Sequence, residues 1–346
     1  MRWMPPCRAG FEGKDMKIRR LDRKEHGETR SLYEEVFCED SKGFVDYYYT
    51  EKTKDNQIYV LEEGGAIRSM LHLNPYILMV NGTRKQSHYI VAVATQKEYR
   101  KRGYMAAVLK KALRDLYAAG ESFTFLMPAA EKIYLPYDFR TVYEQERQYF
   151  AEGPETSAYT AAKEGDCESL AEAANVYLGR KYQVFALRDS AYYKRLIKEY
   201  RSEGGELMIR REDGKITGCL PYVPDEGEGE EKPKIMVRII DVRRMLMSMS
   251  LRSLMAVCFR IVDPVIEENN RCIVATGTEF SGLMLMEGKP GNSEGTITVA
   301  ALASLLFGAE TIEKVCCEEG VVMSERMKEE LRKIIPLSEI CLNEVV

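Results

Sequence analysis

The stretch from Val91 to Tyr137 constrains the fold of this 346-residue chain more than any other segment. It opens with a short apolar, β-prone run, Val91–Thr95, which indicates a buried strand. A polar and strongly basic turn follows, and apolar residues then recur with helical spacing until Gly120, which is placed to end a helix. These apolar residues are Met105, Val108, Leu109, Ala112, Leu113 and Leu116. Phe123–Met127 predicts a second strand, so the order is that of one βαβ unit.

The basic turn between strand and helix is suited to bind an anion. The first N–H groups of a helix have no partner within it, and the helix dipole is positive at that end. Gly103 lets a ligand approach the backbone closely because it has no Cβ. Arg100, Lys101 and Arg102 add positive charge at the rim. Taken alone, these residues also fit a solvated basic turn before an amphipathic helix.

The same block resembles motif A of the GNAT N-acetyltransferases, in which Arg/Gln-x-x-Gly-x-Gly/Ala follows a strand. Here the motif is Arg100-Lys101-Arg102-Gly103, and Met105 stands where the family usually has Gly or Ala. With A-V-A-T-x-x-E-Y-R-x-R-G-Y and I-Y-L-P-Y-D-F around it, the block is similar to the Eis-like (enhanced intracellular survival) branch. The resemblance extends from about residue 16 to the end of the chain, with its sharp motifs in 91–139.

The resemblance implies that acetyl-CoA is the cosubstrate and that its pyrophosphate binds the basic turn. It also implies that the first strand splays from the second, so that its free backbone groups pair with the pantetheine amides and stabilise an oxyanion. An ordinary central strand is the alternative. The implied coenzyme-binding residues are Val93, Ala94, Thr95, Arg100, Lys101, Arg102, Gly103, Tyr104 and Met105.

Tyr134 is the candidate general acid, since it matches the Tyr of the family's Ile-Tyr motif. A thioester leaves as a thiolate with a pKa near 8.5, and a phenol with a pKa of about 10 can protonate it in the transition state. Tyr137 lies one helical turn away and is the rival. The alternative is a structural tyrosine, and the chain has 21 tyrosines.

The resemblance implies that the C-terminal carboxylate, here that of Val346, is the general base that takes the proton of the attacking amine. The last six residues, 341–346, are apolar enough to be buried, which is unusual for a terminus. Glu344 is the alternative carboxylate, and a tail that only stabilises the fold is the alternative role. His88 precedes the central strand and could face the acceptor cleft, although a core or surface position is the more ordinary one for a lone histidine.

The order of predicted elements indicates an α+β protein with a mixed sheet and more than one domain. Residues 1–15 are expected to be a disordered lead-in and residues 16–152 a GNAT acetyltransferase domain, in the order β-α-α-β-β-β-α-β and ending in a short helix and a strand over 143–151. The Eis-like resemblance implies a truncated, degenerate GNAT-like domain over 153–233, without a second coenzyme loop. It also implies a sterol-carrier-like α+β domain over 234–346.

Composition narrows the classes of function. The net charge of −4 gives no basic field for nucleic acid, and no apolar run reaches the length of a membrane helix. Nine scattered cysteines without metal-ligand spacing predict a cytoplasmic protein with reduced thiols and no metal.

Two hypotheses of different class follow. The first is an acetyl-CoA-dependent N-acetyltransferase that acts on a primary amine, either a small molecule or a lysine-containing acceptor, by direct attack in a ternary complex. The second is a lipid or small-molecule binding protein with an inactive GNAT domain. The complete basic turn and Tyr134 favour the enzyme, and the resemblance implies a homo-oligomer of unspecified size.

Overall fold

The computed structural model describes residues 16–145, 150–152, 157–224 and 232–344. The strands are β1 (Met16–Arg20), β2 (Gln57–Glu63), β3 (Ala66–Val80), β4 (Thr83–Thr95), β5 (Phe123–Leu126), β6 (Arg140–Glu144), β7 (Thr160–Ala161), β8 (Val184–Ala186), β9 (Glu206–Glu212), β10 (Lys215–Tyr222), β11 (Lys234–Ile239), β12 (Ser250–Leu251), β13 (Met255–Val262), β14 (Cys272–Thr278), β15 (Gly282–Glu287), β16 (Gly295–Thr298), β17 (Val322–Met323), β18 (Ile334–Ile335) and β19 (Ile340–Cys341).

The α-helices are α1 (Arg30–Val36), α2 (Lys42–Thr50), α3 (Tyr104–Ala118), α4 (Glu131–Tyr134), α5 (Cys167–Lys181), α6 (Ser190–Ser202), α7 (Val242–Leu246), α8 (Val299–Leu306), α9 (Ile312–Val315) and α10 (Glu325–Leu331). Among the short 3-10 turns, η2 (Lys52–Lys54), η3 (Lys97–Tyr99) and η4 (Leu135–Tyr137) bear on the site. No helix of the described residues is long and apolar enough to cross a membrane.

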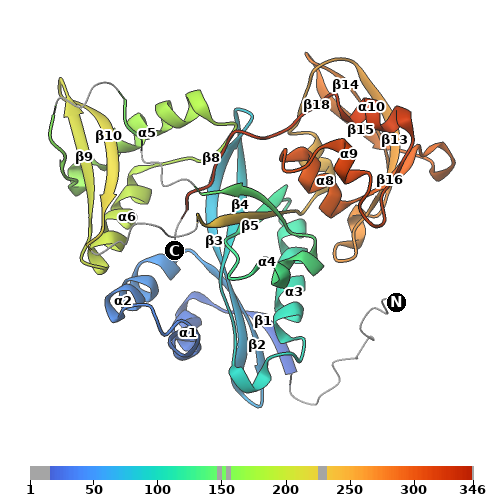
Figure 1. Ribbon diagram of the computed structural model, residues 1–346. Helices are drawn as coiled ribbons and strands as arrows, with labels where there is room; N and C mark the ends of the chain where they lie inside the picture. The colour runs from blue at the N-terminus through green and yellow to red at the C-terminus, as the bar shows by residue number, and fades with distance from the viewer. Residues whose placement is uncertain (1–15, 146–149, 153–156, 225–231, 345–346) are drawn as a thin grey trace.

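A mixed sheet with the order β1-β2-β3-β4-β5-β11-β6 forms the centre of the molecule (Figure 1). Its strands alternate their side chains between two apolar layers, as expected for a sheet covered on both faces. Tyr59 and Leu61 of β2 pack with the apolar face of α3, whereas Ile58 and Val60 pack with α1 and α2. The predicted mixed α+β fold is thereby confirmed.

The strand β11 belongs to this central sheet, in which it is antiparallel to both β5 and β6. These residues were expected at the start of a third domain that begins at residue 234. The difference arises because an apolar run predicts a strand but does not predict its partners. The chain therefore enters its last part only after Ile239.

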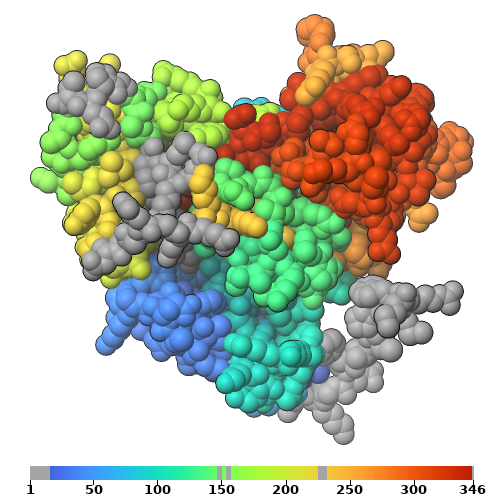
Figure 2. All heavy atoms as spheres, in the orientation of Figure 1, coloured from blue at the N-terminus to red at the C-terminus, as the bar shows by residue number. Residues whose placement is uncertain are grey.

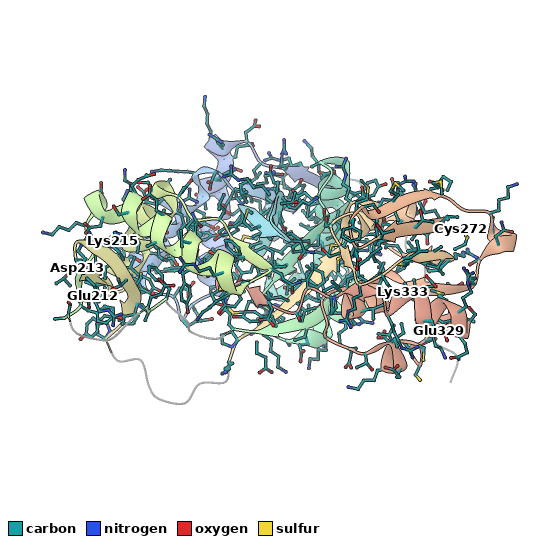
Figure 3. The ribbon with its side chains drawn as sticks, turned by 90° about the horizontal axis from the view of Figure 1, so that it is seen from above. Glu212, Asp213, Lys215, Cys272, Glu329 and Lys333 are labelled. Carbon is teal, nitrogen blue, oxygen red and sulfur yellow. The ribbon has the colours of Figure 1, made fainter. Side chains whose placement is uncertain are left out.

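Two smaller units flank the central sheet. In the second unit, β7, β9 and β10 form a three-stranded sheet that α5 and α6 cover. In the last unit, the five-stranded sheet β15-β14-β13-β16-β17 joins the centre through α8, which contacts β11 and β6. Seen from above, these units lie at opposite ends of the molecule, with Lys215 on one and Lys333 on the other (Figure 3). In the space-filling view a notch separates them above the central sheet (Figure 2).

The C-terminal tail returns to the central sheet. Its strand β19 pairs parallel with β8, and β8 pairs with the end of β3. Cys341, Leu342 and Glu344 are buried, which confirms the expectation of a buried tail for the described part of residues 341–346. Val346, however, lies outside the described residues, as do the lead-in 1–15 and the linker 153–156.

One further prediction needs correction. The strand expected over 143–151 is found as β6, which begins earlier and ends at Glu144. Beyond it, residues 146–149 lie outside the described residues, and Ala151 forms an isolated bridge with Gly218.

Candidate active site

A bulge distorts β4 shortly before its end. The register between β3 and β4 shifts between Met70 and His72, and Ala92 has a φ of 49°. Alanine pays a steric cost in this left-handed region, so surrounding contacts must hold it there. Ala92 is buried among apolar side chains that pack under α1 and α2. The bulge thus changes the direction of β4 at the start of the segment predicted to bind the coenzyme.

The strands β4 and β5 separate at this same place. They pair in parallel only at Tyr89 with Phe125 and at Ile90 with Leu126. Beyond Ile90, β4 runs five more residues to Thr95, paired with β3 on its other side. The edge of Val91–Thr95 that faces β5 is therefore left without a strand partner among the described residues, which is the splay that the family resemblance implied.

The predicted anion-binding turn lies at the surface. After η3, the residues Arg100–Gly103 are all exposed, so no other part of the described chain covers them. Lys101 and Gly103 have positive φ values of 63° and 83°, whereas Arg102 between them does not. A backbone in which positive and negative φ values alternate turns successive N–H groups toward one concave side. At the start of α3 the Ala107 N–H donates to the Gly103 carbonyl (3.0 Å). The N–H groups of the residues before Ala107 have no acceptor within the helix and point out of its N-terminal end.

Several side chains fix the shape of this turn. Arg100 Nε donates to the Thr95 carbonyl (3.2 Å), which ties the turn to the end of β4. The guanidinium groups of Arg68 and Arg102 lie over the ring of Tyr99, at 4.5 and 4.9 Å from its centre. Tyr104, at the start of α3, is buried and donates to Glu63 Oε2 (2.8 Å). Charge and free amides thus lie on a turn whose ends are anchored.

Tyr134 ends α4, in the connection that follows β5. It is only 7% exposed, and its ring packs edge-on against Phe139 at 5.7 Å. Burial raises the pKa of Tyr134 to about 12. Its neighbour Tyr89, the last residue but one to pair with β5, has a pKa that burial raises and that Tyr76 and Tyr134 raise further. Tyr137, the rival, is half-buried in η4, and burial also raises its pKa.

A cavity of about 670 Å³ lies next to the point where β4 and β5 separate. It is bounded by the central sheet, the second unit and the C-terminal tail. Met127, the first residue after β5, lines it, as does Tyr76 of β3. The other walls come from α5, α6, β10 and residues 341–344. Ligand pockets commonly have a volume of about 300–1,000 Å³, so the cavity is large enough for a small molecule or a side chain.

Buried ion pairs line the cavity. The side chain of Glu344 is 1% exposed, and its two carboxylate oxygens accept hydrogen bonds from Arg188 Nη2 (3.2 Å) and Tyr192 Oη (2.8 Å). Arg188 also donates to Tyr192. On the opposite wall, Lys52 pairs with Glu199 (3.4 Å), and the proximity of Tyr76, Glu199 and Glu344 raises the pKa of Lys52 although burial alone lowers it. The side chains of Tyr192 and Glu344 are thus already hydrogen-bonded within the protein.

His88 does not face this cavity. It is buried in the sheet, with Nδ1 2.6 Å from Glu121 Oε1 and Nε2 3.1 Å from the Gln57 side chain. It is therefore a core histidine, as the more ordinary expectation had it.

Sequence reasoning missed the residues that shape the cavity. They are Lys52, Tyr76, Arg188, Tyr192 and Glu199. They come from distant segments, and only Asp189-Ser190, a helix-start signal directly after Arg188, marks one of them locally. The positive φ of Ala92 was not predictable from the sequence either, because alanine is not a residue type that favours the left-handed conformation.

A comparison with family models matches residues 17–142 to the acetyltransferase (GNAT) domain. Residues 17–142 form a GNAT acetyltransferase domain. The match begins within β1 and ends within β6, and it includes the basic turn and Tyr134. No curated protein sequence matches the chain significantly.

Solved structures extend the likeness beyond this domain to almost the whole chain. A GCN5-related N-acetyltransferase from Kribbella flavida has a TM-score of 0.74 at 13% identity and covers 96% of this chain and 100% of its own. A probable N-acyltransferase from Enterococcus faecalis has 0.71 at 14%, covering 93% and 98%. Eis1 from Mycobacterium abscessus has 0.69 at 12%, covering 94% and 98%. At these identities the likeness concerns the fold, and at that level it confirms the Eis-like resemblance.

Proposed function

We propose that the protein transfers the acetyl group of acetyl-CoA to a primary amine, by direct attack of the amine in a ternary complex. The observation that carries the proposal is the open edge of β4 beside an exposed basic turn at the start of α3. Acetyl-CoA supplies an activated acetyl group on a thioester sulfur. The residues present fit it, since free strand amides and a positively charged turn suit pantetheine and pyrophosphate.

The coenzyme is proposed to bind along one continuous line of the backbone. Val93, Ala94 and Thr95 offer N–H and C=O groups to the pantetheine amides, and their N–H groups stabilise the oxyanion that forms during transfer. The turn and the first residues of α3 hold the pyrophosphate through their amides and their positive charge. These residues are Arg100, Lys101, Arg102, Gly103, Tyr104 and Met105.

Tyr134 is proposed to donate a proton to the departing thiolate. Its raised pKa of about 12 keeps the phenol protonated at any physiological pH, as an acid requires. No hydrogen bond to another described residue holds its hydroxyl proton, so the hydroxyl is free to donate. Tyr137 is more exposed than Tyr134, which makes it the weaker candidate.

The amine acceptor is proposed to occupy the cavity of about 670 Å³, since Met127 connects its wall to the end of β5. We propose the terminal carboxylate of Val346 as the base, with Glu344 as the alternative. The buried contacts of Glu344 favour the terminus, because its oxygens already accept from Arg188 and Tyr192. The second unit is proposed to be a degenerate GNAT-like domain and the last unit a sterol-carrier-like domain.

A coupled assay of CoA release tests the proposal. Purified protein with acetyl-CoA is assayed against an aminoglycoside, a polyamine and a lysine-containing peptide, and mass spectrometry identifies the acetylated product. We expect at least one amine to be acetylated at a rate above that of a Gly103→Glu control. Acetyl-CoA that neither binds nor reacts, with a thermal shift caused by lipid alone, would support the carrier hypothesis instead.

A further inference from the structure

The loop that carries Tyr134 crosses over β11. Residues 127–139 connect β5 to β6, and β11 lies between these two strands in the sheet. The ends of this connection lie two strand positions apart, with β11 between them. A side chain of β11 that points toward the connection can anchor it.

Arg238 of β11 provides this anchor. Its side chain is 0% exposed, and Nε donates to the Tyr137 carbonyl (2.9 Å), three residues after Tyr134. Nη1 donates to the Ile239 carbonyl (2.6 Å), and Nη2 donates to Asp263 Oδ1 (2.7 Å). One guanidinium therefore connects the loop of Tyr134, its own strand and the last unit of the chain.

Asp263 is itself held rigidly. Its Oδ1 accepts the backbone N–H groups of Val265 (2.8 Å) and Ile266 (2.9 Å), and its Oδ2 accepts the Asn269 side chain (2.9 Å). A buried carboxylate with this many donors stays in place. It fixes the far end of the Arg238 side chain, and through it the position of the Tyr137 carbonyl.

We propose that Arg238 is a positioning residue for acetyl transfer, which holds the turn from Tyr134 to Tyr137 at its working distance from the separated strands. The inference rests on the proposed role of Tyr134. The Tyr134 hydroxyl has no hydrogen-bond partner among the described residues, so its place depends on the backbone of this turn and on ring packing. A displacement of about 1 Å at a reacting group is enough to lower a rate by about 100-fold.

A double-mutant cycle tests the inference. Arg238→Lys keeps the positive charge opposite Asp263, but one nitrogen cannot reproduce the separate bonds of Nε and Nη2. We expect kcat to fall by about tenfold or more while the Kd for acetyl-CoA changes by less than about twofold. In a Tyr134→Phe background the same change is expected to have no further effect on kcat, because the group it positions is gone.

Two more variants keep the test decisive. Asp263→Asn removes the charge that fixes Arg238 and is expected to show the same loss and the same absence of a further effect in the Tyr134→Phe background. Arg243→Lys makes the same substitution at a surface pair with Glu287 (2.8 Å) and is expected to leave kcat unchanged. The inference would be overturned if Arg238→Lys lowered kcat by the same factor in the parent protein and in the Tyr134→Phe variant. It would also be overturned if Arg238→Lys left kcat unchanged. A normal kcat in Tyr134→Phe alone would instead remove the proposed acid.

Discussion

Asp138 follows Tyr137 and is a carboxyl group whose burial has a measurable cost. Its Oδ2 is buried without a hydrogen bond and lies 4.0 Å from Arg238 Nη2. Burial raises the pKa of Asp138 from 3.8 to about 6, although Arg238 lowers it in part. The native protein therefore binds the proton of this group more tightly than the unfolded chain does, and ionisation destabilises the fold.

The perturbation is Asp138→Asn. The difference between 3.8 and about 6 corresponds to roughly 3 kcal/mol, since each pKa unit is worth about 1.4 kcal/mol. The penalty is absent below the unfolded pKa near 4, grows between pH 4 and 6, and is complete above pH 6. Asparagine carries no charge to bury, and it tolerates the φ of 63° at this position.

The assay is chemical denaturation of both proteins at several pH values from 4 to 8. We expect Asp138→Asn to match the parent near pH 4 and to be more stable by up to about 3 kcal/mol at pH 7. A stability difference that does not change with pH would refute this reasoning, because the electrostatic origin demands the pH dependence. A variant that is less stable at pH 7 would show that the carboxylate makes a favourable interaction.

Three further variants test other parts of the site. Tyr134→Phe is expected to lower kcat by about 100-fold with little change in acetyl-CoA affinity, while Tyr137→Phe serves as the control; equal losses would leave the acid unassigned between them. Ala92→Val places a branched side chain at a φ of 49° and is expected to cost about 2 kcal/mol in denaturation and to weaken coenzyme binding; an unchanged affinity for acetyl-CoA would separate the bulge from the coenzyme site. Glu344→Gln breaks a buried ion pair and is expected to lower stability by about 3 kcal/mol without abolishing turnover. Unchanged stability together with lost turnover would make Glu344 the base.

The parts of the fold that local chemistry determines were predictable from the sequence. Asn81 and Gly82 have positive φ values of 45° and 74° and form the hairpin turn between β3 and β4, as the Asn-Gly pair favours. Gly120, at a φ of 80°, follows the end of α3 as predicted, and Ser324 accepts the Met327 N–H at the start of α10. In each case the residue type satisfies a requirement of its own backbone, so the signal is contained in a few neighbouring positions.

The parts that depend on distant partners were not predictable. β11 is an ordinary apolar strand in sequence, and only tertiary pairing inserts it between β5 and β6. β8 has three residues, too few for any periodicity to show. At the candidate site, the basic turn and Tyr134 could be proposed from the sequence because one continuous segment carries them. The pair of Arg188 and Glu344 joins residues 156 positions apart, and no local pattern announces such a contact.

The central claim is that the amides and charges where a basic turn meets α3 bind the coenzyme, and calorimetric titration with acetyl-CoA tests it most directly. Gly103→Glu puts a carboxylate and a strained backbone into the turn, at a φ of 83°. Gly82→Glu is the matched control, since it has a φ of 74° in an exposed turn at the opposite end of β4. We predict that Gly103→Glu weakens binding by about 100-fold or more, while Gly82→Glu binds as the parent does. Equal affinity in all three proteins would contradict the account.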